Sequence, residues 1–227
     1  GGQGHAGGRL VEYKDDYFLM AHPDYYITGD AREIYKIQDP NSNFGKLLKI
    51  NMKGESSLFS IGHRNTQGLF YDKKNDQVFS TEHGPTGGDE INLVIEGGNY
   101  GWPTTSIGVE IGITKFTDHE EQGFIAPIYT WKTNPGASQI IRLDESFLKE
   151  WSEDLLFASL TGSMVDKSFY PGHSIYRLKM VGKNEASIEE VIFVNSRLRD
   201  LIYDKKKEII ILALENQKKI GLISKNK

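Results

Sequence analysis

A strand–turn–strand pattern recurs along this chain and constrains its fold more than any other feature. Short apolar strands flank charged turns at residues 10–20, 69–80 and 201–214, and a looser copy spans 139–160. Alternating apolar residues bounded by turn residues are typical of antiparallel β-strands. No long stretch of the sequence shows a helical period, and the best helical candidate is the short segment from Ser146 to Trp151. The sequence therefore predicts an all-β protein.

The spacing of the copies predicts a β-propeller. Tyr71 and Tyr203 hold the same place in two copies, and three repeats of about 44 residues, the length of a four-stranded blade, would separate them. One blade cannot bury both faces of its sheet, so blades stack around a common axis. A β-sandwich is the alternative, but sandwiches lack an in-phase repeat of this kind.

Composition excludes several classes of function. The 227 residues carry a net charge of −4, with 38% hydrophobic and 26% charged residues. This balance is that of an ordinary globular protein and argues against nucleic-acid binding as a main role. No apolar run approaches the roughly 20 residues of a membrane-spanning helix. The chain has no cysteine, which excludes thiolate metal sites and cysteine nucleophiles.

Polar residues stand at equivalent places in the hairpins. In an antiparallel hairpin the start of the first strand and the end of the second lie at the same end. Basic residues precede the first strands, and acidic or turn residues follow the second strands: His5, Arg64, Arg197 and Arg199 before, and Asp30, Glu82-His83-Gly84-Pro85 and Glu215-Asn216 after. If the hairpins belong to propeller blades, these residues gather at one mouth of the central channel.

Such a mouth has identifiable chemistry. Three arginines favour a multiply anionic ligand, because guanidinium pairs bidentately with carboxylate. The alternative is that each arginine bridges neighbouring blades through an acidic residue. His5 with Asp30 fits a general base that a carboxylate holds in one tautomer. The alternative for His5 is a solvated side chain near the chain start.

The segment from Thr81 to Glu90 is a candidate metal site. Its Gly-Pro-Thr-Gly-Gly turn frees backbone carbonyls, and its acidic residues add charge, a combination that suits Ca²⁺. The spacing is not that of an EF-hand loop. His63 and His83 lack a third nitrogen ligand nearby, so we interpret them as structural. The segment from Gly97 to Pro103 is followed by no helix, and we expect a turn that packs two aromatic rings.

Several segments together resemble the glucose/sorbosone dehydrogenase family. The match keeps its order across nearly all of the chain. The matching segments are HAGGRL at 5–10, QDPNSNFGKLLKIN at 38–51, GHRNTQGL at 62–69, EHGPTGGDEINL at 82–93, GGNYGWP at 97–103 and SRLRDL at 196–201.

The resemblance implies a fold and an activity. Members look like six-bladed propellers that bind pyrroloquinoline quinone (PQQ) and Ca²⁺ at the channel mouth. They oxidise aldoses at the anomeric carbon to lactones and pass the electrons to an external acceptor. They are usually periplasmic or secreted. On this basis residues 1–227 form a single, partial propeller domain of about four to five blades. We expect the first blades, and thus part of a longer protein, to be missing.

The resemblance also implies catalytic roles. His5 would take the proton from the anomeric hydroxyl, and Asp30 would orient His5. Arg64 would stabilise charge that develops on the quinone oxygen, with Asn65 beside it. Trp131 would border the substrate.

Further residues would bind the cofactor and metal. Arg197 and Arg199 would clamp the cofactor carboxylates. The backbone carbonyls of Gly84 and Pro85 would hold the catalytic Ca²⁺. Glu90 and the carbonyl of Tyr100 match a second, structural Ca²⁺ site of some members.

The chain departs from the family pattern at two further places. Members commonly carry a cofactor-contacting Lys where Thr161 stands here, and Lys167 lies in an insertion before His173. The region 104–129 is short, which points to the aldose sugar dehydrogenase type or to a different substrate. Two alternatives stay open: a cofactor-less propeller that binds a ligand, and a calcium-dependent lactonase. The arginine-rich mouth argues against the lactonase.

Overall fold

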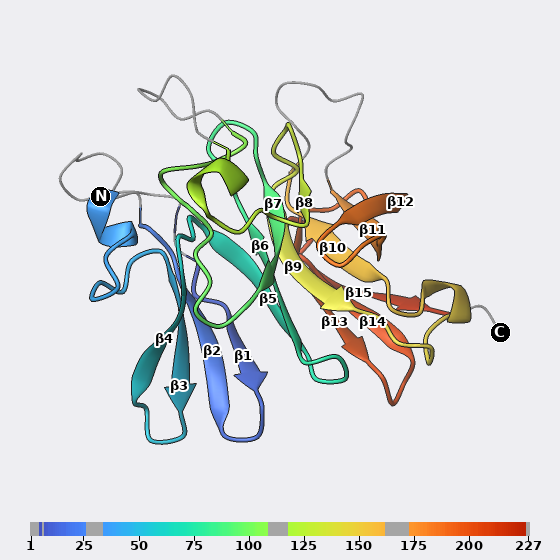
Figure 1. Ribbon diagram of the computed structural model, residues 1–227. Coiled ribbons are helices and arrows are strands. Elements are labelled where there is room, and N and C mark those ends of the chain that lie inside the picture. Colours follow the sequence, from blue (N-terminus) through green and yellow to red (C-terminus); the bar gives the residue numbers. More distant parts are fainter. Residues whose placement is uncertain (1–4, 6, 26–33, 109–117, 162–172, 226–227) are drawn as a thin grey trace. The chain divides into compact units, whose positions relative to one another are not determined.

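The regular secondary structure of the described residues is almost entirely β-strand. The computed structural model describes residues 5, 7–25, 34–108, 118–161 and 173–225, and all structural statements concern these residues. They form four antiparallel sheets, three with four strands and one with three (Figure 1). Short 3₁₀ helices, each three or four residues long, lie between strands: η2 (Ile34–Ile37), η3 (Glu120–Gln122) and η4 (Lys149–Trp151). The predicted all-β class is confirmed.

The chain divides into two compact units, Gly1–Lys132 and Thr133–Lys227. Unit 1 holds two sheets of four strands each. In both sheets the strands pair in sequence order. The first sheet contains β1 (Leu10–Tyr13), β2 (Tyr17–His22), β3 (Lys46–Asn51) and β4 (Ser56–Ile61), and the second contains β5 (Thr66–Asp72), β6 (Gln77–Glu82), β7 (Glu90–Val94) and β8 (Tyr129–Thr130).

Unit 2 repeats this architecture. Its first sheet has four strands and its second has three, again paired in sequence order. The strands are β9 (Ala137–Arg142), β10 (Leu155–Ser159), β11 (Ser174–Met180) and β12 (Ala186–Phe193), then β13 (Leu198–Asp204), β14 (Ile209–Leu214) and β15 (Lys219–Ser224).

All four predicted hairpins form. They correspond to β1–β2, β5–β6, β9–β10 and β13–β14, each antiparallel. The predicted repeat length was wrong, however. Tyr71 lies in β5 and Tyr203 in β13, so two sheet intervals separate them and not three. Long connections cause the difference, because residues 95–128 link β7 to β8 and residues 160–173 link β10 to β11.

The helical candidate was only partly correct. Within Ser146–Trp151, the last three residues form η4 and the preceding ones form a turn. The Asp144 carboxylate accepts the Ser146 backbone N–H at 2.8 Å, which favours a turn over a regular helix.

The core of unit 1 joins its two sheets. Its cluster contains buried residues from both sheets and from the turn after β7: Tyr13, Leu19, Leu47, Phe59, Leu69, Val78, Val94 and Tyr100. The Tyr13 ring packs edge-on against Phe59 and Tyr71, with centroids 5.3 and 4.9 Å away. The predicted aromatic packing of the GGNYGWP turn is confirmed, since Tyr100 and Trp102 are both buried.

A buried lysine fixes the loop that leads into β3. Lys46 is fully buried, and its Nζ donates to the backbone carbonyls of Ile37 and Phe44 at 2.7 and 2.6 Å and of Lys36 at 3.3 Å. Burial lowers the pKa of Lys46 to about 8. The ammonium group therefore ties η2 to the residues just before β3.

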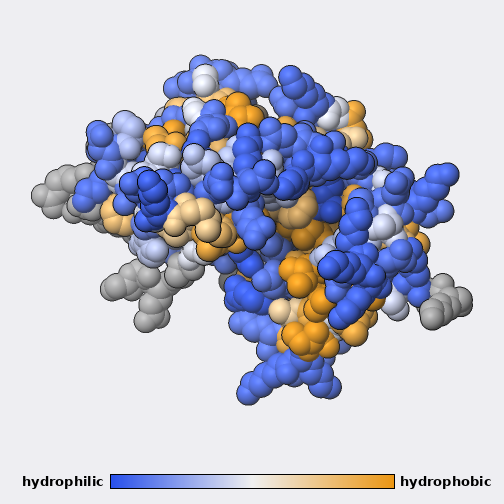
Figure 2. Space-filling model, turned by 90° about the horizontal axis from the view of Figure 1, so that it is seen from below, coloured by the Kyte–Doolittle hydropathy of each residue, from blue (hydrophilic) through white to orange (hydrophobic). Residues whose placement is uncertain are grey.

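The surface mixes polar and apolar side chains. Figure 2 shows hydrophobic atoms exposed among hydrophilic ones on the face seen from below. Within unit 2, Ile202, Ile220 and Leu222 on β13 and β15 are more than half exposed. No helix in the part of the chain that the structure describes is long and apolar enough to cross a membrane.

Candidate active site

The polar residues of unit 1 meet where the β5–β6 hairpin begins and ends. Thr66 opens β5 and pairs in register with Glu82, which closes β6. The register places the segment before β5 beside the turn after β6, as the hairpin argument predicted. The backbone N–H of His83 donates to the Asn65 carbonyl at 3.1 Å and extends this pairing by one step.

A buried hydrogen-bond relay supports this end of the hairpin. His63 Nδ1 lies 2.6 Å from Glu82 Oε1, and His63 Nε2 lies 2.8 Å from Ser60 Oγ. All three side chains are buried, and the His63 ring stacks on Tyr100 at 4.8 Å. The interpretation of His63 as structural is therefore supported: its imidazole bridges β4 to β6 and carries no open coordination position.

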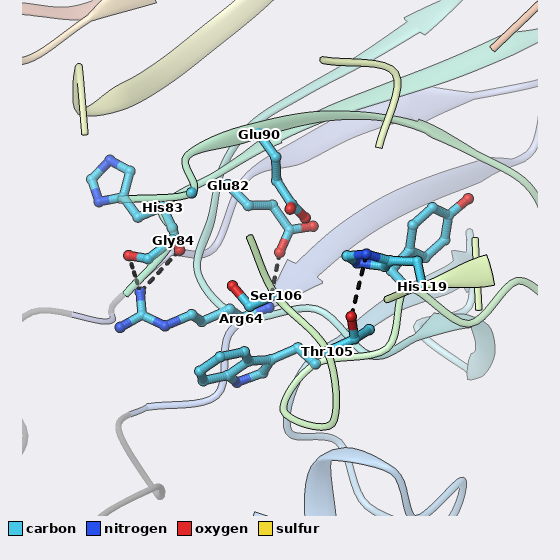
Figure 3. Close-up of a pocket in the computed structure, with 11 residues that line it drawn as sticks. Arg64, Glu82, His83, Gly84, Glu90, Thr105, Ser106 and His119 are labelled. Carbon is cyan, nitrogen blue, oxygen red and sulfur yellow. Dashed lines mark hydrogen bonds between the residues drawn. The ribbon is translucent and has the colours of Figure 1, made fainter. Parts of the chain in front are cut away.

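Arg64 is held at both its backbone and its side chain. Its backbone N–H donates to Glu82 Oε2 at 2.8 Å. Its Nη1 donates to the carbonyls of His83 at 2.9 Å and Gly84 at 2.8 Å (Figure 3). The guanidinium lies 5.1 Å from the Trp102 ring centre, within cation–π range. Only 7% of Arg64 is exposed, so its charge is compensated by these groups and not by solvent.

A narrow pocket opens beside this arginine and will be called the Arg64 pocket. Its cavity volume is about 10 Å³, room for one water-sized species. Its lining is mostly polar: Arg64, Glu82, His83, Gly84, Gly88, Glu90, Tyr100, Trp102, Thr105, Ser106 and His119. The pocket is far too small for a sugar or a quinone.

Two carboxylates meet in the Arg64 pocket. The Asn92 amide donates to Glu90 Oε1 at 2.9 Å and to Glu82 Oε1 at 3.3 Å, so it bridges them (Figure 3 shows the two carboxylates together). Loss of solvent around the carboxyl and the nearby Glu82 charge raise the pKa of Glu90 to about 8. Concentrated negative charge of this kind favours a bound cation or a proton.

His5 is placed by an acid that the sequence analysis did not single out. His5 Nδ1 lies 2.6 Å from Asp24 Oδ1, and both side chains are buried. Trp102 Nε1 donates to the other carboxylate oxygen of Asp24 at 3.0 Å. Donation from Nδ1 to a carboxylate fixes the tautomer in which Nε2 carries the lone pair, as a general base requires.

The base and Arg64 share one neighbourhood. The backbone N–H of Asp24, the partner of His5, donates to the Arg64 carbonyl at 2.8 Å. Trp102 contacts Asp24 through its indole N–H and Arg64 through its ring. The structure therefore brings His5 and Arg64 together, as their equivalent hairpin positions predicted. Asp30 lies outside the described residues, and its predicted role stays a prediction.

Arg197 and Arg199 form a cluster with Glu215 in unit 2. Both donate to Glu215, from Arg197 Nε at 2.8 Å and from Arg199 Nε at 3.0 Å. Arg197 Nη1 also reaches the Leu160 carbonyl at 3.3 Å. The three charged side chains are partly exposed. Burial alone would raise the pKa of Glu215, but the two guanidinium groups outweigh it and lower that pKa.

The remaining predicted residues have varied surroundings. Asn65 is buried, and its Oδ1 accepts a hydrogen bond from Gln67 at 2.7 Å. Trp131 is buried in unit 1, where its backbone N–H donates to the Asp89 carbonyl at 2.8 Å. The Tyr100 hydroxyl donates to the Leu93 carbonyl at 2.8 Å. Thr161 is half-buried, and its backbone N–H donates to the Pro135 carbonyl at 3.0 Å. Lys167 lies outside the described residues.

The turn after β6 fits a hard cation. No cluster of three or more His, Asp or Glu side chains in the described ranges has metal-binding geometry. Backbone oxygens are the alternative ligands, and they converge here: a Cβ on Gly84 would lie 2.2 Å from the Gly87 oxygen and 2.4 Å from the Gly88 oxygen. Pro85 follows in the same turn. Closely packed carbonyls with nearby carboxylates are a donor set that Ca²⁺ uses.

Asp24 and Lys46 were not predicted from the sequence, for identifiable reasons. Asp24 follows β2, which ends at His22, whereas the acidic residue at the end of this hairpin was expected at Asp30. Reading the strand end from the apolar run Tyr17 to Ala21 would have found it. Lys46 shows no local signal, because a lysine that opens a strand is usually exposed.

Four antiparallel sheets, with charged side chains gathered at the hairpin ends, define an all-β protein of the β-propeller type. Residues 1–222 match the family described as Glucose / Sorbosone dehydrogenase. The chain belongs to this family, and the resemblance of its motifs is confirmed.

Individual proteins agree with this assignment. The chain is similar to Aldose sugar dehydrogenase YliI of Escherichia coli (strain K12), with 28% identity over 173 residues that cover 69% of this chain and 45% of that protein. It is similar in fold to a crystal structure of glucose dehydrogenase, with a TM-score of 0.81 and 23% identity over 99% of this chain and 65% of that one.

A third similar protein is the PQQ-bound form of an aldose sugar dehydrogenase from Streptomyces coelicolor. Its TM-score is 0.69 and its identity 24%, over 98% of this chain and 59% of that chain. At this level of identity both solved structures establish the fold alone. The chain spans about half the length of the curated relatives that it matches over most of its own length.

Proposed function

We propose that this protein takes part in PQQ- and Ca²⁺-dependent oxidation of aldoses at the anomeric carbon to lactones, with electrons passed to an external acceptor. One observation supports this most strongly. His5 is held through Nδ1 by the buried Asp24 beside Arg64, an arrangement of base and cation that proton removal next to hydride transfer needs. Membership of a family that includes sugar dehydrogenases supports the reaction class.

The base acts through His5 Nε2. This atom accepts the proton of the anomeric hydroxyl, and the imidazolium that forms is stabilised by the Asp24 carboxylate. Asp24 is held by Trp102 Nε1 and by its own backbone bond to Arg64, so the imidazole keeps one orientation. Trp131 would border the sugar, where an aromatic face packs against its C–H groups.

The arginines would hold the cofactor. PQQ, when bound with Ca²⁺, supplies the acceptor for the hydride that leaves the anomeric carbon. Arg64, with Asn65 beside it, would offer guanidinium N–H groups to the quinone oxygen. Arg197 and Arg199 are partly exposed and would pair with the cofactor carboxylates.

The turn after β6 would hold the catalytic Ca²⁺ through the carbonyls of Gly84 and Pro85. A second, structural Ca²⁺ would use the Glu90 carboxylate and the carbonyl of Tyr100, at the acidic Arg64 pocket. The proposed location is periplasmic or secreted, where Ca²⁺ and the quinone are available.

A cofactor-less ligand-binding protein is the second candidate. Thr161 favours it, because a threonine cannot supply the positive charge that a lysine would offer to a cofactor carboxylate. Such a protein would bind a ligand at the same residues but would not oxidise a sugar.

Titration of the purified protein with PQQ and Ca²⁺, followed by absorbance, separates the candidates. We expect a saturable quinone band and dye reduction that needs an aldose. A saturable band without dye reduction over a panel of aldoses would favour the ligand-binding protein. Lactone hydrolysis without added quinone would favour the lactonase.

A further inference from the structure

We propose that the Arg64 guanidinium is an internal stand-in for Ca²⁺ on the Gly84 carbonyl, so that the guanidinium and the ion exclude each other there. The inference rests on the proposed function, because that function places the Ca²⁺ on this carbonyl. It adds that cofactor and Ca²⁺ bind cooperatively, since a cofactor that draws Arg64 away removes the guanidinium that competes with the ion.

The contact geometry is that of a cation and its ligands. A single nitrogen, Arg64 Nη1, donates to the carbonyls of two successive residues, His83 at 2.9 Å and Gly84 at 2.8 Å (Figure 3). Two carbonyls that converge on one positively charged point are equally a partial coordination shell for a metal ion. Two cations on one carbonyl oxygen would repel each other strongly in a site withdrawn from water.

The turn keeps these oxygens in place whichever cation is present. The Gly84 backbone N–H donates to Asp89 Oδ1 at 3.0 Å, and Gly88 N–H donates to the Trp131 carbonyl at 2.8 Å. The space over Gly84 is filled by the oxygens of Gly87 and Gly88. The carbonyls are therefore preorganised, and exchange requires only that the arginine side chain moves.

Charge around the site favours replacement over loss of the cation. Glu82 and Glu90 line the Arg64 pocket, and Asp89 is fully buried beside it. Among the described lining residues, Arg64 carries the one permanent positive charge. If its guanidinium moved away alone, buried carboxylates would lose their compensation, which is costly. A divalent ion restores it, and the cavity has room for one species of that size.

Cofactor and ion then become coupled. An anionic cofactor that pairs with the guanidinium removes it from the Gly84 carbonyl and thereby strengthens ion binding. Linkage requires the reciprocal effect, so the ion strengthens cofactor binding by the same factor.

Calorimetric titration of the cofactor-free protein with CaCl₂ tests the exclusion directly. We expect Arg64→Ala to bind Ca²⁺ at least about tenfold more tightly than the wild type, a change of about 1.4 kcal/mol. The Ca²⁺ affinity of Arg64→Lys should lie between the two, because the lysine side chain keeps a positive charge but is shorter and lacks the planar guanidinium. Arg9→Ala is the matched control, because Arg9 is half-buried in the same unit and donates to the Gln67 carbonyl at 2.8 Å.

Several outcomes would overturn the proposal. They are equal Ca²⁺ affinities of Arg64→Ala and Arg9→Ala, weaker binding by Arg64→Ala, and no Ca²⁺ binding by any variant. The titration contains no PQQ. If the proposed function failed because the protein does not bind PQQ, the Ca²⁺ affinities of the variants would still test the exclusion.

A second measurement avoids dependence on a folded Arg64→Ala protein. In the ¹⁵N-labelled wild type, the Arg64 Nε–Hε signal, assigned by its loss in Arg64→Lys, should shift as Ca²⁺ saturates. Saturation of the ion site while this signal stays unchanged would show that Arg64 does not leave, and the proposal would fail.

Discussion

Asp24 Oδ1 lies 2.6 Å from His5 Nδ1, although the two residues are nineteen positions apart in the sequence. Both are buried, and Trp102 Nε1 donates to the second Asp24 oxygen at 3.0 Å. A buried carboxylate is costly unless its hydrogen bonds are satisfied. This one is satisfied by an imidazole and an indole, and the imidazole is thereby fixed in the orientation that a base needs.

Asp24→Asn should therefore reduce turnover with little loss of cofactor binding. The amide carries no charge to stabilise the imidazolium. Its N–H₂ can also donate to His5 Nδ1, which favours the tautomer with the proton on Nε2, the atom that must accept a proton. We expect kcat for aldose-dependent dye reduction to fall about 10²–10⁴-fold. Asp16→Asn, at an exposed position in the β1–β2 turn, is the control and should leave kcat unchanged. A kcat for Asp24→Asn within a factor of two of wild type would rule out the assigned role.

His63→Ala should destabilise the fold more than its size alone predicts. The substitution leaves the Glu82 charge buried without its imidazole partner and removes the stack on Tyr100. We expect the free energy of unfolding in urea to fall by about 3 kcal/mol or more. Ser60→Ala removes the other end of the same relay and should cost about 1 kcal/mol. Equal costs for the two variants would contradict the role of the His63 imidazole as the partner of the buried Glu82 carboxylate.

Arg197→Ala and Arg199→Ala should weaken cofactor binding while changing the stability of the fold little. Both ion pairs with Glu215 are partly exposed, so each substitution should change the free energy of unfolding by less than about 1 kcal/mol. Each should weaken PQQ binding about tenfold or more, because a charge-assisted hydrogen bond is lost. Lys205→Ala, which removes an exposed ion pair with Asp144 in the same unit, should leave PQQ binding intact. Unaltered affinity in both arginine variants would remove them from the cofactor site.

Lys46 should give the protein an unusual alkaline stability profile. Burial lowers its pKa to about 8 in the folded state, against 10.5 as the ordinary value. Between these values the unfolded chain carries the extra proton, so the free energy of unfolding rises with pH across this window. Relative to Lys46→Met, we expect wild-type stability to gain about 1–3 kcal/mol from pH 8 to pH 10.5. A difference between the two proteins that stays constant with pH would show that Lys46 does not titrate there.

The hairpins could be predicted because their signals are local. Apolar alternation and charged turns lie within about two dozen residues in each copy, so strand pairing follows from the sequence alone. The length of the repeat could not be predicted in the same way, since the connections after β7 and β10 carry no periodicity of their own. Tyr71 and Tyr203 were thus placed in phase correctly but assigned one repeat too many.

The site was predictable in part for the same reason. Arg64 and His5 lie close together because both precede the first strand of a hairpin, and that position can be recognised in the sequence. Asp24 was not found, because its place depends on where β2 ends. Lys46 was not found either, since its three carbonyl partners are brought together only by the tertiary fold.

The central claim, oxidation of an aldose at the anomeric carbon, can be tested by following one labelled atom. The reconstituted protein would be supplied with PQQ, Ca²⁺, an electron-accepting dye and an aldose labelled with ¹³C at C1. We predict that the C1 signal moves to that of a lactone or aldonate carbonyl only when PQQ is present, and that His5→Ala abolishes this conversion. A folded protein that binds PQQ and Ca²⁺ but leaves every C1 signal of an aldose panel unchanged would contradict the account.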